Sequence, residues 1–285
     1  MSEVIDKNHV LPHRLFAMAA AVNECPNIPR ADLLRLVQPS PVNESLETSG
    51  NIFIKCQLCG LIAESQDKLR TATLAVDPRV VTDFEAFRTY MQLTLLGVTN
   101  EDEDHFILNQ FTAWYATQDD TVLTLSKHEL ETRFHDGVYP GVQNLVIRDE
   151  PGIGAWQAWA QFLGSGWQSE FSVFVPDCTL RVLPLLPDLL PDTDFISFSL
   201  FMEHLSAHCS ELDGGALFER CWEACRPQER RGNRLSLMLS TALRVLNQRG
   251  VITLENRADS TENWTLFPAQ SYIARVTHIR RGTSQ

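Results

Sequence analysis

The clearest alternation of hydrophobic and polar positions lies near the C-terminus, between residues 234 and 249. At 100° per residue the apolar side chains fall on one face of a helix: Leu235, Met238, Leu239, Ala242, Leu243 and Leu246. Short polar side chains and one arginine fall on the opposite face, and Gly250 follows at the position where helices commonly end. The pattern predicts an amphipathic helix whose polar face is free for a partner.

The segments around this helix predict the rest of a small domain. Residues 198–209 and 216–225 have helical spacing, with a turn at 213–215 between them and Pro227 after the second. Residues 251–255 and 264–267 are strand-like and flank a polar loop. Three helices followed by a hairpin predict a winged helix-turn-helix over Ile196–Phe267, within a C-terminal domain of residues 192–285.

The N-terminus repeats this order. Residues 13–22, 30–38 and 43–59 predict three helices, and Gly60 precedes a hairpin of residues 61–64 and 69–74. Gly50 and the β-branched Ile52 and Ile54 weaken the prediction of the third helix. We expect a second winged helix in a domain of residues 1–76.

The middle of the chain, residues 77–191, predicts helices at 83–96, 103–116, 126–134 and 155–163. The predicted fold is therefore mainly α with small β-hairpins. Winged helix-turn-helix domains at the C-terminus and the N-terminus flank a helical, acidic middle domain.

The net charge of −12 is unevenly distributed. Residues 71–195 hold 6 basic and 19 acidic side chains, whereas residues 196–285 hold 11 and 9, and every cation of that last segment is arginine. The acidic total therefore does not exclude nucleic-acid binding by the C-terminal domain. A polar N-terminus and the lack of a long apolar stretch favour a cytoplasmic protein without membrane contact, with most of its seven cysteines reduced.

A winged helix places its third helix in the major groove of double-stranded DNA, and its wing contacts the backbone. Arginine suits both contacts because its planar fork donates parallel hydrogen bonds to phosphate or guanine. The polar helix face, the preceding turn and the wing provide the DNA-binding candidates: Arg226, Arg230, Arg231, Asn233, Arg234, Ser236, Ser240, Arg244, Asn247 and Arg257. A solvated face, or one that docks a protein, is the alternative.

Other combinations of residues give weaker signals. Cys56 and Cys59 form a single CxxC, which favours buried thiols over a four-ligand zinc site. His204 and His208 share a helix face but lack the glutamate of a metalloprotease motif between them. Histidines among carboxylates (His105, His128 and His135) have no nucleophile elbow or phosphate loop beside them. We therefore expect no catalytic site, no metal and no cofactor.

Aromatic residues interrupted by glycine mark the segment GIGAWQAWAQFLGSGW, with Trp156, Trp159, Gly164, Gly166 and Trp167. The helical spacing of the tryptophans favours core packing over base stacking. With the two winged-helix-like ends, this segment resembles the G component (DpdG-like) of Dpd clusters, which place 7-deazaguanine derivatives in DNA and restrict DNA lacking them. The resemblance implies an accessory DNA-associated subunit beside helicase, nuclease or ATPase partners, and implies no active-site residue.

These observations favour a non-enzymatic winged-helix DNA-binding or adaptor subunit of a bacterial DNA-modification or phage-defence complex. Double-stranded DNA and other subunits of that complex are the expected partners. Two alternatives remain open. One is a stand-alone winged-helix transcriptional regulator, and the other is a scaffold whose winged helices bind proteins, as in chromosome-organising complexes.

Overall fold

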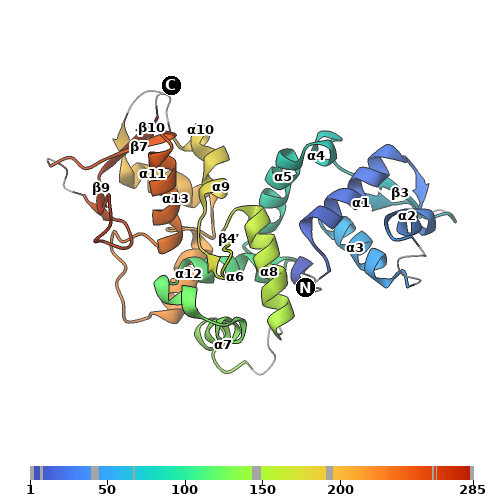
Figure 1. Cartoon of the computed structure of the whole chain (residues 1–285), viewed down its shortest axis with the longest axis horizontal. Helices are drawn as coiled ribbons and strands as arrows, with labels where there is room; N and C mark the ends of the chain where they lie inside the picture. Colours follow the sequence, from blue (N-terminus) through green and yellow to red (C-terminus); the bar gives the residue numbers. More distant parts are fainter. Residues whose placement is uncertain are drawn as a thin grey trace.

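The computed structural model describes residues 3–6, 9–39, 45–66, 68–142, 149–190, 195–258, 260 and 262–282. The chain runs from an N-terminal unit at one end of the long axis, through central helices, to a C-terminal unit at the other end (Figure 1). The described residues are mainly helical and their sheets are small and antiparallel. The mainly α fold with small hairpins is confirmed.

The N-terminal unit has the predicted order of elements. Its helices and strands are α1 (Pro12–Glu24), β1 (Ile28–Pro29), α2 (Arg30–Val37), α3 (Glu47–Leu58), β2 (Ile62–Glu64) and β3 (Thr71–Leu74). The three strands form one sheet in the order β1-β3-β2. Gly60 has a φ of 68° at the junction between α3 and the hairpin, a conformation that glycine adopts without strain. Residue 43, where the third helix was expected to begin, lies outside the described residues.

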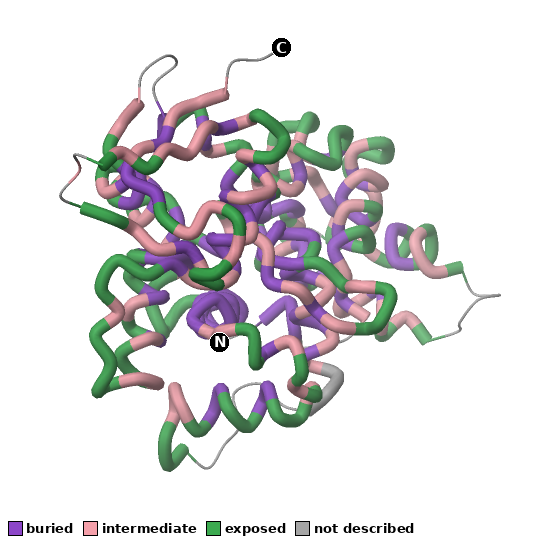
Figure 2. Tube along the Cα trace, turned by 60° about the vertical axis from the view of Figure 1, so that its left-hand side comes forward, coloured by how far each residue is buried: buried purple, intermediate pink, exposed green. Residues whose placement is uncertain are grey.

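The middle of the chain is built from helices and one short hairpin. Its elements are η1 (Val4–Asp6), α4 (Arg79–Thr82), α5 (Phe84–Leu96), α6 (Phe106–Ala116), η2 (Asp120–Thr124), α7 (Lys127–Val138), α8 (Asp149–Leu163), β4 (Trp167–Gln168), β5 (Phe174–Val175), α9 (Thr179–Val182), η3 (Leu183–Leu185) and α10 (Leu186–Leu189). Every residue of α6 is buried. Helices α5, α7, α12 and α13 all contact α6. Figure 2 shows that buried residues gather in the interior of the molecule and exposed ones along its outside.

An aromatic cluster forms the core around α6 and α8. The rings of Phe111 and Trp156 meet edge to face at 4.7 Å between centroids, a favoured geometry for aromatic pairs. Trp156 and Trp159 are fully buried, and their indole N–H groups donate to the Thr112 hydroxyl and the Val10 carbonyl. These two tryptophans are core residues, as predicted, whereas Trp167 is 46% exposed.

The C-terminal unit contains β6 (Ile196–Ser197), α11 (Phe198–His208), α12 (Ala216–Cys225), α13 (Leu237–Gln248), β7 (Ile252–Glu255), β8 (Trp264–Thr265), β9 (Arg275–Val276) and β10 (His278–Arg281). The predicted pairing of residues 264–267 with 251–255 is wrong. Strand β7 pairs with β10, and β6 pairs with the other edge of β10. Residues 264–265 instead form a separate hairpin with β9, and the backbone of Thr265 also bonds to Asn233 and Leu235 ahead of α13.

The limits of the three domains stay predictions. Residues 191–194, which include the expected boundary before the C-terminal domain, lie outside the described part. Helix α12 packs on α6 and α7, and α13 packs on α9. The C-terminal unit therefore shares a buried interior with the middle of the chain.

Candidate nucleic-acid interface

Helix α13 begins at a capped serine beside a buried aspartate. The Ser236 hydroxyl accepts the Leu239 N–H at 3.1 Å and donates to Asp213 at 2.6 Å. Asp213 has no exposed surface, and it also accepts from Arg231 at 2.6 Å and from the Ser236 N–H at 2.7 Å. Arg231 and Ser236, both predicted to contact DNA, thus hold the turn before α13 in place. Asp213, which lies in the turn predicted at residues 213–215, organises the turn before α13.

One face of α13 is buried as predicted, through Met238, Leu239, Ala242, Leu243 and Leu246. The expectation that the opposite face is open is wrong at Ser240. This residue is fully buried, and its hydroxyl accepts the Phe267 N–H at 2.8 Å. The tip of the β8–β9 hairpin lies across the polar face and removes Ser240 from solvent.

Arg244 fixes the same hairpin tip. Its guanidinium donates to the carbonyls of Tyr272 at 3.0 Å, Ile273 at 3.2 Å and Pro268 at 3.3 Å, and also to that of Phe267. Partial burial lowers the pKa of Arg244 from its ordinary value. The side chain predicted to reach a DNA base is thus engaged by residues 267–273, a segment we call the α13 strap.

Three further candidates bond within the protein. Asn247 accepts the Leu254 N–H at 2.9 Å. Arg226 lies 4.6 Å from the Trp222 ring centroid and within 3.7 Å of both Asp119 and Glu229. Arg257 pairs with Glu255 at 2.5 Å. The charges of Arg226 and Arg257 are therefore partly compensated.

The remaining three candidates are exposed and lie close together along the chain. Arg230, Asn233 and Arg234 are all exposed, in the turn between α12 and α13. The backbone of this turn is fixed because the Arg234 carbonyl accepts from Arg231, and Asn233 and Arg234 lie beside Thr265. These residues retain the solvent access that a groove contact needs.

Helix α3, the counterpart of α13 in the N-terminal unit, has an apolar outer face. Ile54 is 44% exposed and Leu58 is 38% exposed, one helical turn apart, whereas Lys55 is buried. In the hairpin that follows, Glu64 pairs with Arg70 at 2.8 Å and with Arg30 at 3.6 Å. The surface of this helix therefore lacks the exposed cations that phosphate contact requires.

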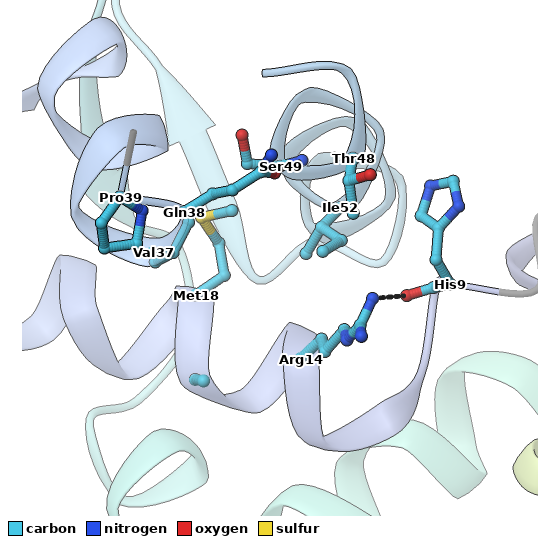
Figure 3. A pocket seen from close by; sticks show the side chains of 10 residues that line it. His9, Arg14, Met18, Val37, Gln38, Pro39, Thr48, Ser49 and Ile52 are labelled. Carbon is cyan, nitrogen blue, oxygen red and sulfur yellow. Dashed lines mark hydrogen bonds between the residues drawn. The ribbon is translucent and has the colours of Figure 1, made fainter. Parts of the chain in front are cut away.

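A pocket of about 480 Å³ opens between α1, the end of α2 and the start of α3 (Figure 3). Met18 and Ile52 contribute apolar walls. Arg14 donates to the His9 carbonyl at 3.1 Å, and Gln38 accepts the Ser49 N–H at 3.0 Å. Its polar groups thus bind the protein's own backbone.

Cys56 and Cys59 are both buried, as the single CxxC predicts. Burial raises the pKa of Cys59 to about 12 and the pKa of Cys56 well above its ordinary value, so both remain thiols near neutral pH. Cys59 Sγ lies 3.8 Å from His105 Nε2. Across the residues that the structure describes, no group of three or more histidine, cysteine or carboxylate side chains is arranged to hold a metal ion.

His204, His208, His128 and His135 each make separate contacts. His204 and His208 both direct Nδ1 at backbone carbonyls, those of Leu189 and His204, at 3.2 and 2.9 Å. His128 lies 3.8 Å from Glu131 and is exposed, whereas His135 packs against the rings of Phe134 and Tyr139. His204, His208 and His135 therefore contact neighbouring parts of the fold, whereas His128 is exposed.

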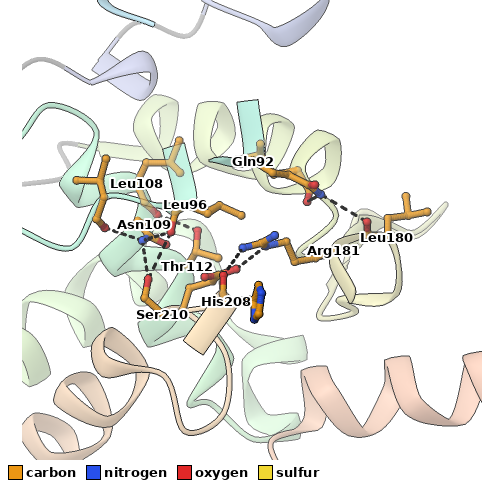
Figure 4. A network of polar contacts seen from close by, with 12 residues as sticks. Gln92, Leu96, Leu108, Asn109, Thr112, Leu180, Arg181, His208 and Ser210 are labelled. Carbon is orange, nitrogen blue, oxygen red and sulfur yellow. Dashed lines mark hydrogen bonds and ion pairs between the residues drawn. The ribbon is translucent and has the colours of Figure 1, made fainter. Parts of the chain in front are cut away.

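A buried polar network joins the middle of the chain to the C-terminal unit (Figure 4). Arg181 pairs with Glu211 at 2.8 Å, with 4% and 0% of the two side chains exposed, and donates to the His208 carbonyl at 3.1 Å. Burial opposes the charge on Arg181, but Glu211 holds the pKa of the guanidinium above its ordinary value. Asn109 bridges the Leu96 carbonyl and the Ser210 hydroxyl. The network fixes the turn between α11 and α12 against α6 and α9.

Comparison with known proteins identifies one family. The family model described as DpdG-like matches residues 2–260. No curated protein and no solved structure matches the chain. Within the described residues, no helix has the length and apolar character needed to cross a membrane.

Proposed function

Since the chain belongs to the DpdG-like family, we propose that it is a non-enzymatic adaptor subunit of a bacterial Dpd DNA-modification and defence system. Its two end units act as winged helices in this proposal. The N-terminal unit binds another subunit of the complex, and the C-terminal unit contacts double-stranded DNA. The acidic middle of the chain connects the two.

The element order at the chain ends supports the winged-helix part of this proposal. In each unit three helices precede a pair of antiparallel strands, β2 and β3 in the N-terminal unit and β7 and β10 in the C-terminal unit. A short third strand completes each sheet, β1 in the N-terminal unit and β6 in the C-terminal unit. This order is that of a helix-turn-helix extended by a wing.

The adaptor role rests on one observation above all: neither third helix offers an open, cationic face. Ser240 and Arg244 of α13 are engaged by the α13 strap. The outer face of α3 instead exposes Ile54 and Leu58. Exposed apolar side chains on a helix favour docking of a protein surface, since burying them removes apolar area from water.

DNA contact is proposed for the turn before α13. Arg230 and Arg234 provide two exposed cations, and Asn233 provides an amide that can bond to phosphate or to an adenine edge. We propose that these three residues contact DNA, and that the polar face of α13 does not. Arg226, Arg231 and Ser236 then act as supports of the turn.

Co-expression of the tagged full chain with the other subunits of its Dpd system tests the adaptor role. The complex is purified and its composition measured by size-exclusion chromatography with light scattering. Ile54→Glu/Leu58→Glu is expected to release a subunit that the native chain retains. Leu93→Glu is the matched control, because Leu93 is 68% exposed on α5 and lies outside the proposed surface.

Two results would contradict this proposal. One is a complex that retains every subunit when Ile54 and Leu58 are both replaced by glutamate. The other is a chain that binds a single palindromic operator as a dimer and forms no complex, which would identify a stand-alone regulator. Arg230→Glu/Arg234→Glu is expected to weaken DNA binding while leaving the complex intact, which separates the two contacts.

A further inference from the structure

The sheet of the C-terminal unit has one buried face and one outer face. Strand register places Ile279 of β10 opposite Ile196 and Leu254, and Ile279 and Ile252 are buried. Because side chains alternate along a strand, His278 and Arg280 lie on the other face. Their partners across the sheet are Glu255 and Thr253 of β7. The outer face of the sheet is thus polar at these positions.

Two arginines approach one aromatic ring at this face. The guanidinium carbon of Arg280 lies 4.7 Å from the Phe195 ring centroid, and that of Arg257 lies 4.8 Å from the same centroid. Phe195 stands directly before β6, beside β10. Two guanidiniums are therefore held against the same ring.

The positive charges of Arg257 and Arg280 have different partners. Arg257 pairs with Glu255 at 2.5 Å. Arg280 Nε, in contrast, is a buried atom without a hydrogen-bond acceptor in the described part of the chain. A guanidinium without a carboxylate partner binds a phosphate oxygen through short, charge-assisted hydrogen bonds. Within the described residues Arg280 has no carboxylate partner, so Arg257, Arg280 and Glu255 together carry one uncompensated positive charge.

We propose that Arg257 and Arg280, with Phe195 holding them in place, bind the phosphate backbone of double-stranded DNA. The arginine fork fits phosphate oxygens, and the surrounding segment, residues 196–285, carries 11 basic and 9 acidic side chains. Phe195 already packs against both guanidiniums, so the contact is to phosphates and reads no sequence. This inference rests on the proposed function and adds a second DNA contact beyond the turn before α13.

Fluorescence anisotropy of the full chain on two labelled 20-base-pair duplexes of unrelated sequence tests this surface. Affinity is measured at several salt concentrations for the native chain and for Arg257→Gln/Arg280→Gln. Loss of two phosphate contacts is expected to reduce the slope of log K against log salt by roughly 2, equally for both duplexes. Arg280→Lys/Arg257→Lys keeps the charge and is expected to restore most of the slope.

Arg249→Gln is the matched control, because Arg249 is an exposed arginine at the end of α13 that lies outside the cluster. Far-UV circular dichroism and the thermal midpoint verify that each variant folds. An unchanged slope in the double glutamine variant overturns the inference, as does a loss confined to one duplex or a native chain that binds neither. The subunit assay with Ile54→Glu/Leu58→Glu tests the adaptor role without DNA. Its result therefore stands even if the full chain fails to bind DNA.

Discussion

The hydroxyl of Ser240 accepts the backbone N–H of Phe267 at 2.8 Å, and this bond attaches the β8–β9 hairpin to the face of α13 that was expected to meet DNA. Ser240 is fully buried by that contact. The hairpin is closed by the Leu266 N–H, which donates to the Ala274 carbonyl at 3.0 Å. A helix with ideal amphipathic spacing therefore has both of its long faces in contact with its own chain.

Replacing Arg244 with alanine is expected to release the α13 strap. The substitution removes a guanidinium that donates to four carbonyls, including those of Tyr272 and Ile273. The free energy of unfolding is expected to fall by roughly 1–3 kcal/mol, since the part-buried carbonyls of Phe267 and Ile273 lose a charged donor. Hydrogen exchange is expected to rise within residues 266–274, and chymotrypsin cleavage at Tyr272, 83% exposed, to accelerate.

Arg249→Ala serves as the comparison for this prediction, because Arg249 is exposed one turn beyond Arg244 on the same helix. Its exchange pattern is expected to match that of the native chain. Equal protection of the strap in the Arg244 and Arg249 variants would show that the carbonyl contacts do not hold it.

The buried pair of Arg181 and Glu211 gives a second prediction. Arg181→Met leaves a fully buried carboxylate without its partner, and is expected to cost roughly 3–5 kcal/mol of unfolding free energy. Arg181→Met/Glu211→Met is expected to recover most of that loss, because neither charge then remains buried. Urea unfolding measures both.

The exposed pair of Arg79 and Asp77 provides the surface control for this experiment. Its two side chains are 85% and 50% exposed, so Arg79→Met is expected to leave the unfolding midpoint unchanged. A double methionine variant as unstable as the single one would indicate that the network acts through its bonds to the His208 carbonyl and not through charge.

The glycines after α8 give a third prediction. A Cβ added at Gly166 would lie 2.4 Å from the Phe174 ring. A Cβ added at Gly164, whose φ is 81°, would lie 2.8 Å from the backbone nitrogen of Arg181. Each change to alanine is expected to destabilise the fold by roughly 1–3 kcal/mol. Gly50→Ala, in α3 with no atom within 4 Å of the added carbon, is expected to stabilise it by about 0.5–1 kcal/mol. The thermal midpoints of the three variants, compared with that of the native chain, test these expectations.

Local signals were enough to predict most of the helices. The spacing from Met238 to Leu246 and the glycine at 250 gave α13 within three residues at each end. The same is true of α5, whose Asp83 cap accepts the Glu85 N–H. These features depend on neighbours within one or two turns, which a sequence displays directly.

The candidate site depended on contacts that span tens of residues. Ser240 and Arg244 are covered by residues 267–273. The helical pattern predicts that both lie on a polar face, but it does not show whether solvent or another segment of the chain covers that face. Strand β7 pairs with β10 across an intervening hairpin, whereas the nearest strand-like segment after the loop was the expected partner. The cluster at Phe195 joins residues 195, 257 and 280, which only the folded sheet brings together. Contacts between residues distant in sequence, and not local secondary-structure propensity, determine the surroundings of these residues.

Buried thiols give the last prediction, which concerns alkaline pH. Burial raises the pKa of Cys59 to about 12, with Lys55 opposing the shift, and burial likewise raises the pKa of Cys221 to about 12, against an ordinary value of 9.0. The folded chain therefore retains protons that the unfolded chain loses, so this stabilisation is complete below pH 9 and is lost as the pH rises through 12. The free energy of unfolding, measured with urea between pH 8 and pH 11, is expected to fall more steeply for the native chain than for Cys59→Ala/Cys221→Ala. Cys25→Ala, which removes an exposed thiol, is expected to follow the native slope, and parallel curves for all three proteins would show that these thiols ionise equally in both states.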